Sequence, residues 1–176
     1  MATSTQTTVS NPLDFDLQGT FAGYWVAVLR VVTGYWFLHA GVTKFAFISG
    51  ESFSAQGWLA NAPAASPIQG FLMWAGQTPW LLEFTNVMIP IGETLIGLGL
   101  LVGALVRLAS FFGAFLMVFF YLGNAAWSHG LVNGDLMGLL LFVTLGVLGA
   151  GRVLGLDSVI EDMDFADNRI AKYILG

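Results

Sequence analysis

The sequence contains no cysteine, and this absence excludes several kinds of redox centre. Disulfides, thiolate metal sites, cysteine-ligated iron–sulfur clusters and a dithiol relay within the chain all require that residue. The two histidines are too few for typical haem or zinc sites, so we expect no resident metal. Redox chemistry by this protein would therefore need a diffusible cofactor or a partner subunit.

Charged residues are also scarce. They make up 10% of the 176 residues, whereas hydrophobic residues make up 56%. Soluble domains contain about 25% charged residues. Residues 84–154 contain only four charges, Glu93, Arg107, Asp135 and Arg152. This depletion indicates an integral membrane protein, whose apolar surface contacts the lipid bilayer.

Basic clusters are missing as well, which argues against nucleic-acid binding. The formal net charge is −5. The opening "MATSTQTTVSNPLDFD" is polar and has no Lys or Arg, and no small-residue cleavage site is evident after the first apolar run. A secretory signal peptide has both a basic start and such a site. We therefore expect the first span to be retained.

Four apolar stretches are long enough to cross a hydrocarbon core of about 30 Å. We place them at about residues 21–43, 84–106, 108–127 and 136–154, within a membrane domain of residues 19–155. Residues 1–18 are predicted to form a polar tail. The predicted fold class is all-α, a polytopic membrane four-helix bundle.

Two further segments are expected to lie at the membrane surface. Residues 67–82, with Trp74 and Trp80, are too short to span, and indole rings prefer the headgroup level. They predict a short interfacial or re-entrant helix. Residues 156–176 place apolar side chains on one helical face and acids on the other, which predicts a C-terminal amphipathic helix. It would lie on the membrane, dock on a partner or pack under the bundle.

The positions of Lys and Arg predict the orientation of the spans. In a four-span chain Arg107, Arg152, Arg169 and Lys172 fall on one side, and Lys44 falls on the other. The protein is therefore expected to be a multi-pass protein of the cell membrane with both termini in the cytoplasm.

Ionisable residues inside the spans are candidate functional residues, because a charge near the bilayer centre costs about 2.5–3.5 kcal/mol on insertion scales. Arg30 and Glu93 lie deep in the first and second spans, on faces that also carry glycines. We predict that they pair inside the bundle. The pair would be either a structural ion pair that fixes helix register or the floor of a ligand or proton site.

Three other polar residues lie in the same two spans. Lys44 is near the outer boundary, where it either snorkels to the headgroups or binds an anionic substrate or a quinone head. His39 lies about 180° around its helix from Arg30, toward a neighbouring helix or subunit. Asn86 shares the polar stripe of the second span with Glu93.

These spans resemble the DoxX family. "LRVVTGYWFLHAGVTKF" is similar to its first-helix pattern of an arginine, a glycine-aromatic step, then a glycine and a lysine. "IGETLIGLGLLVGALVRLAS" is similar to its second-helix pattern. The resemblance covers roughly residues 20–155, and the matching positions are Arg30, Gly34, Gly41, Lys44, Glu93, Gly97, Gly103 and Arg107.

The resemblance implies quinone-linked oxidation of sulfur compounds, because the family includes DoxD, the membrane subunit of thiosulfate:quinone oxidoreductase. A quinone cofactor would lie between the helices, where its binding residues would be Trp36, Phe37, Lys44 and Asn86. The reduced form would be stabilised, or protons passed, by Arg30, Glu93 and His39. A cationic outer mouth would attract a small sulfur oxyanion.

Two other functions remain open. One is a non-enzymatic scaffold that anchors a soluble redox enzyme, for example through the acidic C-terminal segment. The other is a small-molecule transporter, although four spans would then need to dimerise to enclose a pathway. A second oxidoreductase subunit and a homo-oligomer are both compatible with the sequence.

Overall fold

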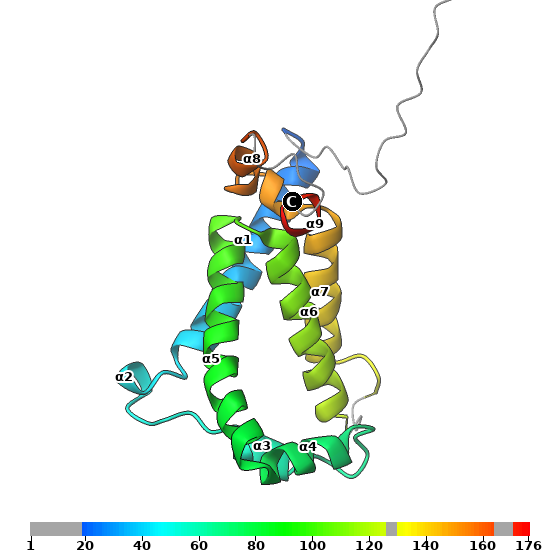
Figure 1. The fold of residues 1–176 in the computed structure, drawn as a ribbon. Coiled ribbons are helices and arrows are strands. Elements are labelled where there is room, and N and C mark those ends of the chain that lie inside the picture. Colours follow the sequence, from blue (N-terminus) through cyan, green and yellow to red (C-terminus); the bar gives the residue numbers. More distant parts are fainter. Residues whose placement is uncertain (1–18, 126–129, 164–170) are drawn as a thin grey trace, which may run out of the picture.

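The computed structural model describes residues 19–125, 130–163 and 171–176, in which every regular element is helical (Figure 1). The predicted all-α class is confirmed for this part, and the predicted tail at residues 1–18 lies outside it. The elements are α1 (Phe21–Val42), α2 (Ala46–Ser49), α3 (Gln56–Ala60), α4 (Gln69–Gln77), α5 (Pro79–Val102), α6 (Val106–Gly123), α7 (Gly134–Val147), η1 (Ala150–Arg152), α8 (Asp157–Ile160) and α9 (Ala171–Ile174).

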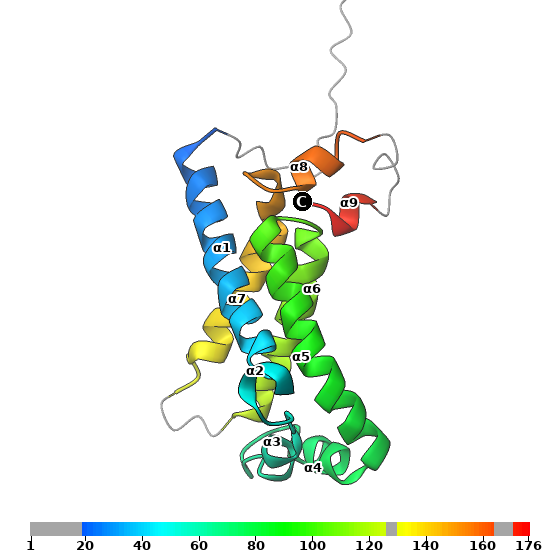
Figure 2. The same cartoon turned by 90° about the vertical axis from the view of Figure 1, so that its left-hand side faces the viewer.

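Three of the described helices, α1, α5 and α6, are long and apolar enough to cross a membrane. The fourth predicted span corresponds to α7, which is apolar but has 14 residues, a rise of about 21 Å. It packs along α6, and both views show α1 and α5 beside this pair (Figures 1 and 2). By length and composition, three of the described helices are therefore candidates to cross the membrane, and the four-span bundle stays a prediction.

The second span begins earlier than predicted. Helix α5 starts at Pro79, which suits the first turn because its missing N–H has no helical acceptor there. It ends at Gly103, whose φ of +71° is the left-handed conformation that glycine adopts without strain. The segment predicted at residues 67–82 consists of α4 and the first turn of α5. Helices α3 and α4 lie across one end of the long helices (Figure 1).

The predicted continuous helix over residues 156–176 is wrong. Helix α8 ends at Ile160, and residues 161–163 form a turn and a bend. Asp157, expected on the acidic face, is fully buried and accepts hydrogen bonds from three backbone N–H groups rather than facing water. One of these donors is Gly176, so the described end of the chain packs under the long helices.

Apolar side chains from α1, α5, α6 and α7 meet in one core. Its centre includes the ring of Phe37 on α1, which contacts Phe142 on α7 with ring centroids 4.6 Å apart. Gly113 on α6 leaves the space that the Phe142 ring occupies. The aromatic contact therefore links three of the four helices.

The backbones of α1 and α5 touch through glycines. A Cβ atom on Gly34 would lie 2.7 Å from the backbone nitrogen of Leu101, and one on Gly41 would lie 2.5 Å from that of Thr94. A Cβ on Gly97 would overlap the backbone of Leu38. These glycines fix the antiparallel register of the two helices, because no other residue fits at the contact.

We predict that Gly97→Ala lowers the free energy of unfolding by about 1–3 kcal/mol, because the added methyl group forces two backbones apart. Gly92→Ala is the matched control on the same helix, since a Cβ there meets nothing within 4 Å. It should be neutral or stabilising by up to about 1 kcal/mol. Unfolding titrations of both variants in detergent micelles measure the difference. Equal effects would contradict the role of the glycine contact.

Candidate functional site

Arg30 lies on α1 where the ends of two other segments meet. Its side chain is 2% exposed, and its guanidinium donates to the carbonyls of Leu100 (2.7 Å) on α5 and Leu154 (3.0 Å) after η1. Longer bonds reach Leu101 and Val153. The last carbonyls of a helix have no partners within it and form its negative end. Arg30 therefore caps α5.

Asp157 caps the start of α6, as Arg30 caps the end of α5. Its carboxylate accepts from the backbone N–H groups of Leu105 (2.7 Å), Val106 (2.9 Å) and Gly176 (3.0 Å). The first two belong to the positive end of α6, where a carboxylate is stabilising. A cation and an anion thus hold the two ends of the tight α5–α6 turn.

The predicted Arg30–Glu93 ion pair is wrong. The prediction requires the start of α1 to lie level with the end of α5. In the structure, the start of α1 extends past the end of α5 to the level of α8 (Figure 2). The glycine register then sets Arg30 against Leu100. Glu93 lies seven residues before Leu100, about 10 Å along the helix.

Glu93 pairs instead with Lys44, which follows α1. The Lys44 Nζ to Glu93 Oε2 distance is 2.5 Å, and Nζ also donates to the carbonyl of Ala40 at 3.0 Å. Glu93 is 4% exposed, whereas a quarter of the Lys44 side chain is exposed. The ammonium points back along α1 to Ala40 and Glu93, which is not the snorkelling arrangement.

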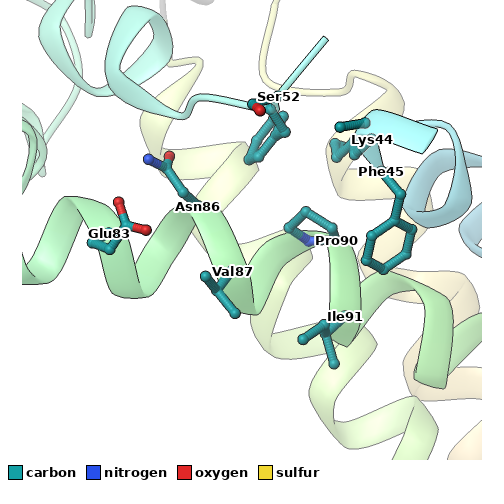
Figure 3. A pocket seen from close by; sticks show the side chains of 10 residues that line it. Lys44, Phe45, Ser52, Glu83, Asn86, Val87, Pro90 and Ile91 are labelled. Atoms are coloured by element: carbon teal, nitrogen blue, oxygen red, sulfur yellow. The ribbon is translucent and has the colours of Figure 1, made fainter. Parts of the chain in front are cut away.

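The exposed side of Lys44 lines a pocket of about 340 Å³ (Figure 3). One wall comes from the chain after α1 and the other from α5. The lining residues are Lys44, Phe45, Ala46, Ser52 and Phe53 on the first wall, and Glu83, Asn86, Val87, Pro90 and Ile91 on the second. The Lys44 ammonium also lies 5.7 Å from the centre of the Phe53 ring.

Asn86 and Pro90 supply polar groups on the α5 wall. The side-chain oxygen of Asn86 accepts from the backbone N–H of Ala55 (2.8 Å), which fixes the loop before α3 and leaves the amide NH₂ as a donor. Pro90 has no N–H, so the carbonyl of Asn86 loses its usual helical partner. The pocket therefore adjoins both donors and an acceptor.

The other predicted site residues lie elsewhere. Phe37 is buried in the core, and Trp36 lies against it at the surface of α1. His39 is exposed and stacks on Tyr35, with ring centroids 5.9 Å apart. The structure thus brings together Lys44, Glu93 and Asn86, and separates them from Arg30, Trp36, Phe37 and His39.

Sequence reasoning missed two kinds of residue. Phe45 and Phe53 line the pocket from a segment that carries no periodic pattern, so nothing in the sequence singled them out. Asp157 was interpreted as one of several acids on a solvated helix face. Its position two residues after Gly155, where the chain turns beneath α6, was the available signal.

The relationship to known proteins agrees with this geometry. The sequence model of a family described as "TQO small subunit DoxD" matches residues 25–175. The chain belongs to the DoxD family. The match covers α1 from residue 25 onward, the other long helices and all residues of the pocket, and it confirms the resemblance seen in the first two spans. With its apolar helices, this DoxD protein is a membrane protein.

Other comparisons of the DoxD chain give no match, either among curated proteins or among solved structures. Within the described residues, no group of three or more His, Cys, Asp and Glu side chains is placed to hold a metal ion. The pocket and the family membership are therefore the two findings that bear on function.

We predict that Lys44 and Glu93 are energetically coupled and that Arg30 and Glu93 are not. A double-mutant cycle on Lys44→Met and Glu93→Gln should give a coupling energy of about 0.5–3 kcal/mol, as contacting charges do. The cycle on Arg30→Met and Glu93→Gln should be additive within about 0.5 kcal/mol, because these groups share no partner. Unfolding free energies in micelles give both values, and the reverse pattern would restore the original pairing.

Proposed function

We propose that this DoxD protein is the membrane subunit of a quinone-linked oxidoreductase for small sulfur compounds such as thiosulfate, and that its pocket binds the quinone ring. The observation that carries the proposal is the pair of hydrogen-bond donors, on Lys44 and Asn86, that flank a partly aromatic pocket between α5 and the chain that follows α1.

Both donors have capacity left for a ligand. An ammonium has three N–H groups, and those of Lys44 bind two acceptors among the described residues, Glu93 and Ala40. The Asn86 amide has two N–H groups, and the described residues offer them no acceptor. A quinone carbonyl accepts such hydrogen bonds, and Phe45 and Phe53 offer apolar surface to the ring.

The charge around the pocket favours a neutral ligand. The positive charge of Lys44 is offset by Glu93 at 2.5 Å, and Glu83 on the wall adds a further carboxylate. This balance disfavours a sulfur oxyanion, and it replaces the expectation of a cationic mouth. We therefore place the sulfur compound outside this pocket, on a partner subunit or at the interface with one.

Reduction of a quinone held here would need two electrons, released as the sulfur compound is oxidised at its separate site, and two protons taken up from water. Lys44 contacts both the pocket and the buried carboxylate of Glu93, so it could pass one of these protons to a ring oxygen and regain one from water, while Glu93 holds its ammonium in place. The Asn86 carbonyl freed by Pro90 is an acceptor for a hydroxyl group of the reduced ring. With both termini in the cytoplasm, as proposed from the basic residues, the pocket lies toward the outer leaflet.

We predict that Asn86→Asp weakens binding of a tail-free benzoquinone about three- to tenfold, which corresponds to one lost hydrogen bond. The new carboxylate still accepts from Ala55 but cannot donate to the ring. The double variant Lys44→Met/Glu93→Gln should have a similar effect, and it leaves no buried carboxylate unpaired. Titration of the protein in lipid nanodiscs measures the dissociation constants.

Glu83→Gln is the control within the pocket. Binding of a neutral ring should change less than twofold, because the substitution alters charge at nearly constant volume. Thiosulfate should not compete with the quinone in any variant. Thiosulfate competition that strengthens in Glu83→Gln would assign the pocket to the anion, and well-folded protein without saturable quinone binding would favour the scaffold function.

A further inference from the structure

The pocket has an apolar side that hydrogen bonding to a quinone ring does not use. Val87 and Ile91 line it from α5 and are also exposed at the surface of that helix. Across from them, Ala46 opens α2, whose Phe47 is 85% exposed. Helix α2 projects away from the long helices (Figure 1), so apolar groups flank the pocket on the outer side of these helices.

The exposed side chains continue along α5 beyond the pocket. Residues on one helical face recur at steps of three and four, and the exposed apolar residues of α5 follow this spacing. Six of them, Phe84, Val87, Met88, Ile91, Leu95 and Leu98, form what we call the α5 stripe. From Ile91, at the middle of α5, to Leu98 the stripe extends about 10 Å toward the C-terminal end of the helix.

We infer that the pocket opens sideways into the bilayer between α2 and α5, and that the alkyl tail of its ligand lies along the α5 stripe. This inference rests on the proposed function, because it concerns the same pocket, but it adds the route of access and the tail site. A ligand with a polar ring and a long tail fits, since its ring reaches Lys44 and Asn86 while its tail stays in contact with apolar surface.

The opposite route is less favourable for such a ligand. Access from water would lead past Glu83 and Ser52, the polar residues of the rim, and would expose the tail to water, which costs about 0.8 kcal/mol for each methylene group. Phospholipid acyl chains share the tail chemistry. Competition with a tail-free ring distinguishes a ligand tail from a phospholipid acyl chain. A ring that occupies the pocket removes the ligand and its tail from the stripe, whereas an acyl chain binds the stripe whether or not the pocket is occupied.

A photoreactive probe tests the inference directly. A benzoquinone with a ten-carbon tail that ends in a diazirine is added to the protein in phosphatidylcholine nanodiscs, and the labelled residues are mapped by mass spectrometry. We expect labels on the α5 stripe near Leu95 and Leu98, which an excess of tail-free benzoquinone displaces. Displaceable labels on α3 or α4 instead would overturn lateral access and leave the proposed quinone site intact.

Absence of any displaceable label, together with no saturable binding of the tail-free ring, would instead overturn the proposed function.

A matched pair of variants completes the design. Leu95→Trp alters the stripe outside the pocket, and Leu140→Trp alters an exposed position on α7. Leu95→Trp should weaken binding of the tailed probe about fourfold or more, which corresponds to the lost contact of one methylene group. It should leave the affinity for the tail-free ring unchanged. Equal behaviour of the two variants would contradict a tail site on α5.

Discussion

The backbone contact between α1 and α5 is the constraint on which the other polar interactions depend. Gly34 and Gly97 allow the two helices to touch, and their contact fixes which residues lie opposite one another along the whole pair. At one end this register places Arg30 beside the last carbonyls of α5. At the other it places Lys44 within reach of Glu93. A slip of one turn would leave a buried guanidinium and a buried carboxylate unpaired, each at a cost of several kcal/mol.

At each end of the α1–α5 pair a basic side chain needs partners away from water, and the two ends supply them differently. Arg30 is enclosed, and its two terminal nitrogens donate to the carbonyls of Leu100 and Leu154 at the end of α5 and after η1. Lys44 keeps part of its surface in a pocket and uses a buried carboxylate to hold its charge in place. Both are ionisable residues in or next to an apolar helix, and such residues are functional candidates by default. Access to a cavity, rather than depth, is the reason for proposing Lys44 and not Arg30 as the ligand-binding residue.

Much of the fold follows from the sequence, because apolar length and the scarcity of charge determine where helices can lie in lipid. The sequence also places glycines on the same helix faces as Arg30 and Glu93, and three of these, Gly34, Gly41 and Gly97, are where α1 and α5 touch. The pairing of charges was not predictable in the same way. It depends on how far α1 extends past α5, and residue counts from helix ends do not contain that offset. Asp157 was misassigned for a related reason, since an acid that caps another helix has the same local sequence pattern as an acid facing water.

The site was partly predictable because polar residues inside spans are rare and each needs a partner. Lys44, Glu93 and Asn86 carried that signal, whereas Phe45 and Phe53 come from a segment whose path only the tertiary structure defines. The arrangement of these residues also bears on which substrate of the proposed quinone-linked enzyme this pocket would bind. A pocket whose lysine is neutralised by Glu93, and whose rim carries Glu83, suits a neutral ring that comes from the bilayer. A dianion from water needs uncompensated positive charge, which this pocket does not supply. The proposed function therefore needs a second site for the sulfur compound, for which a partner subunit is our proposal.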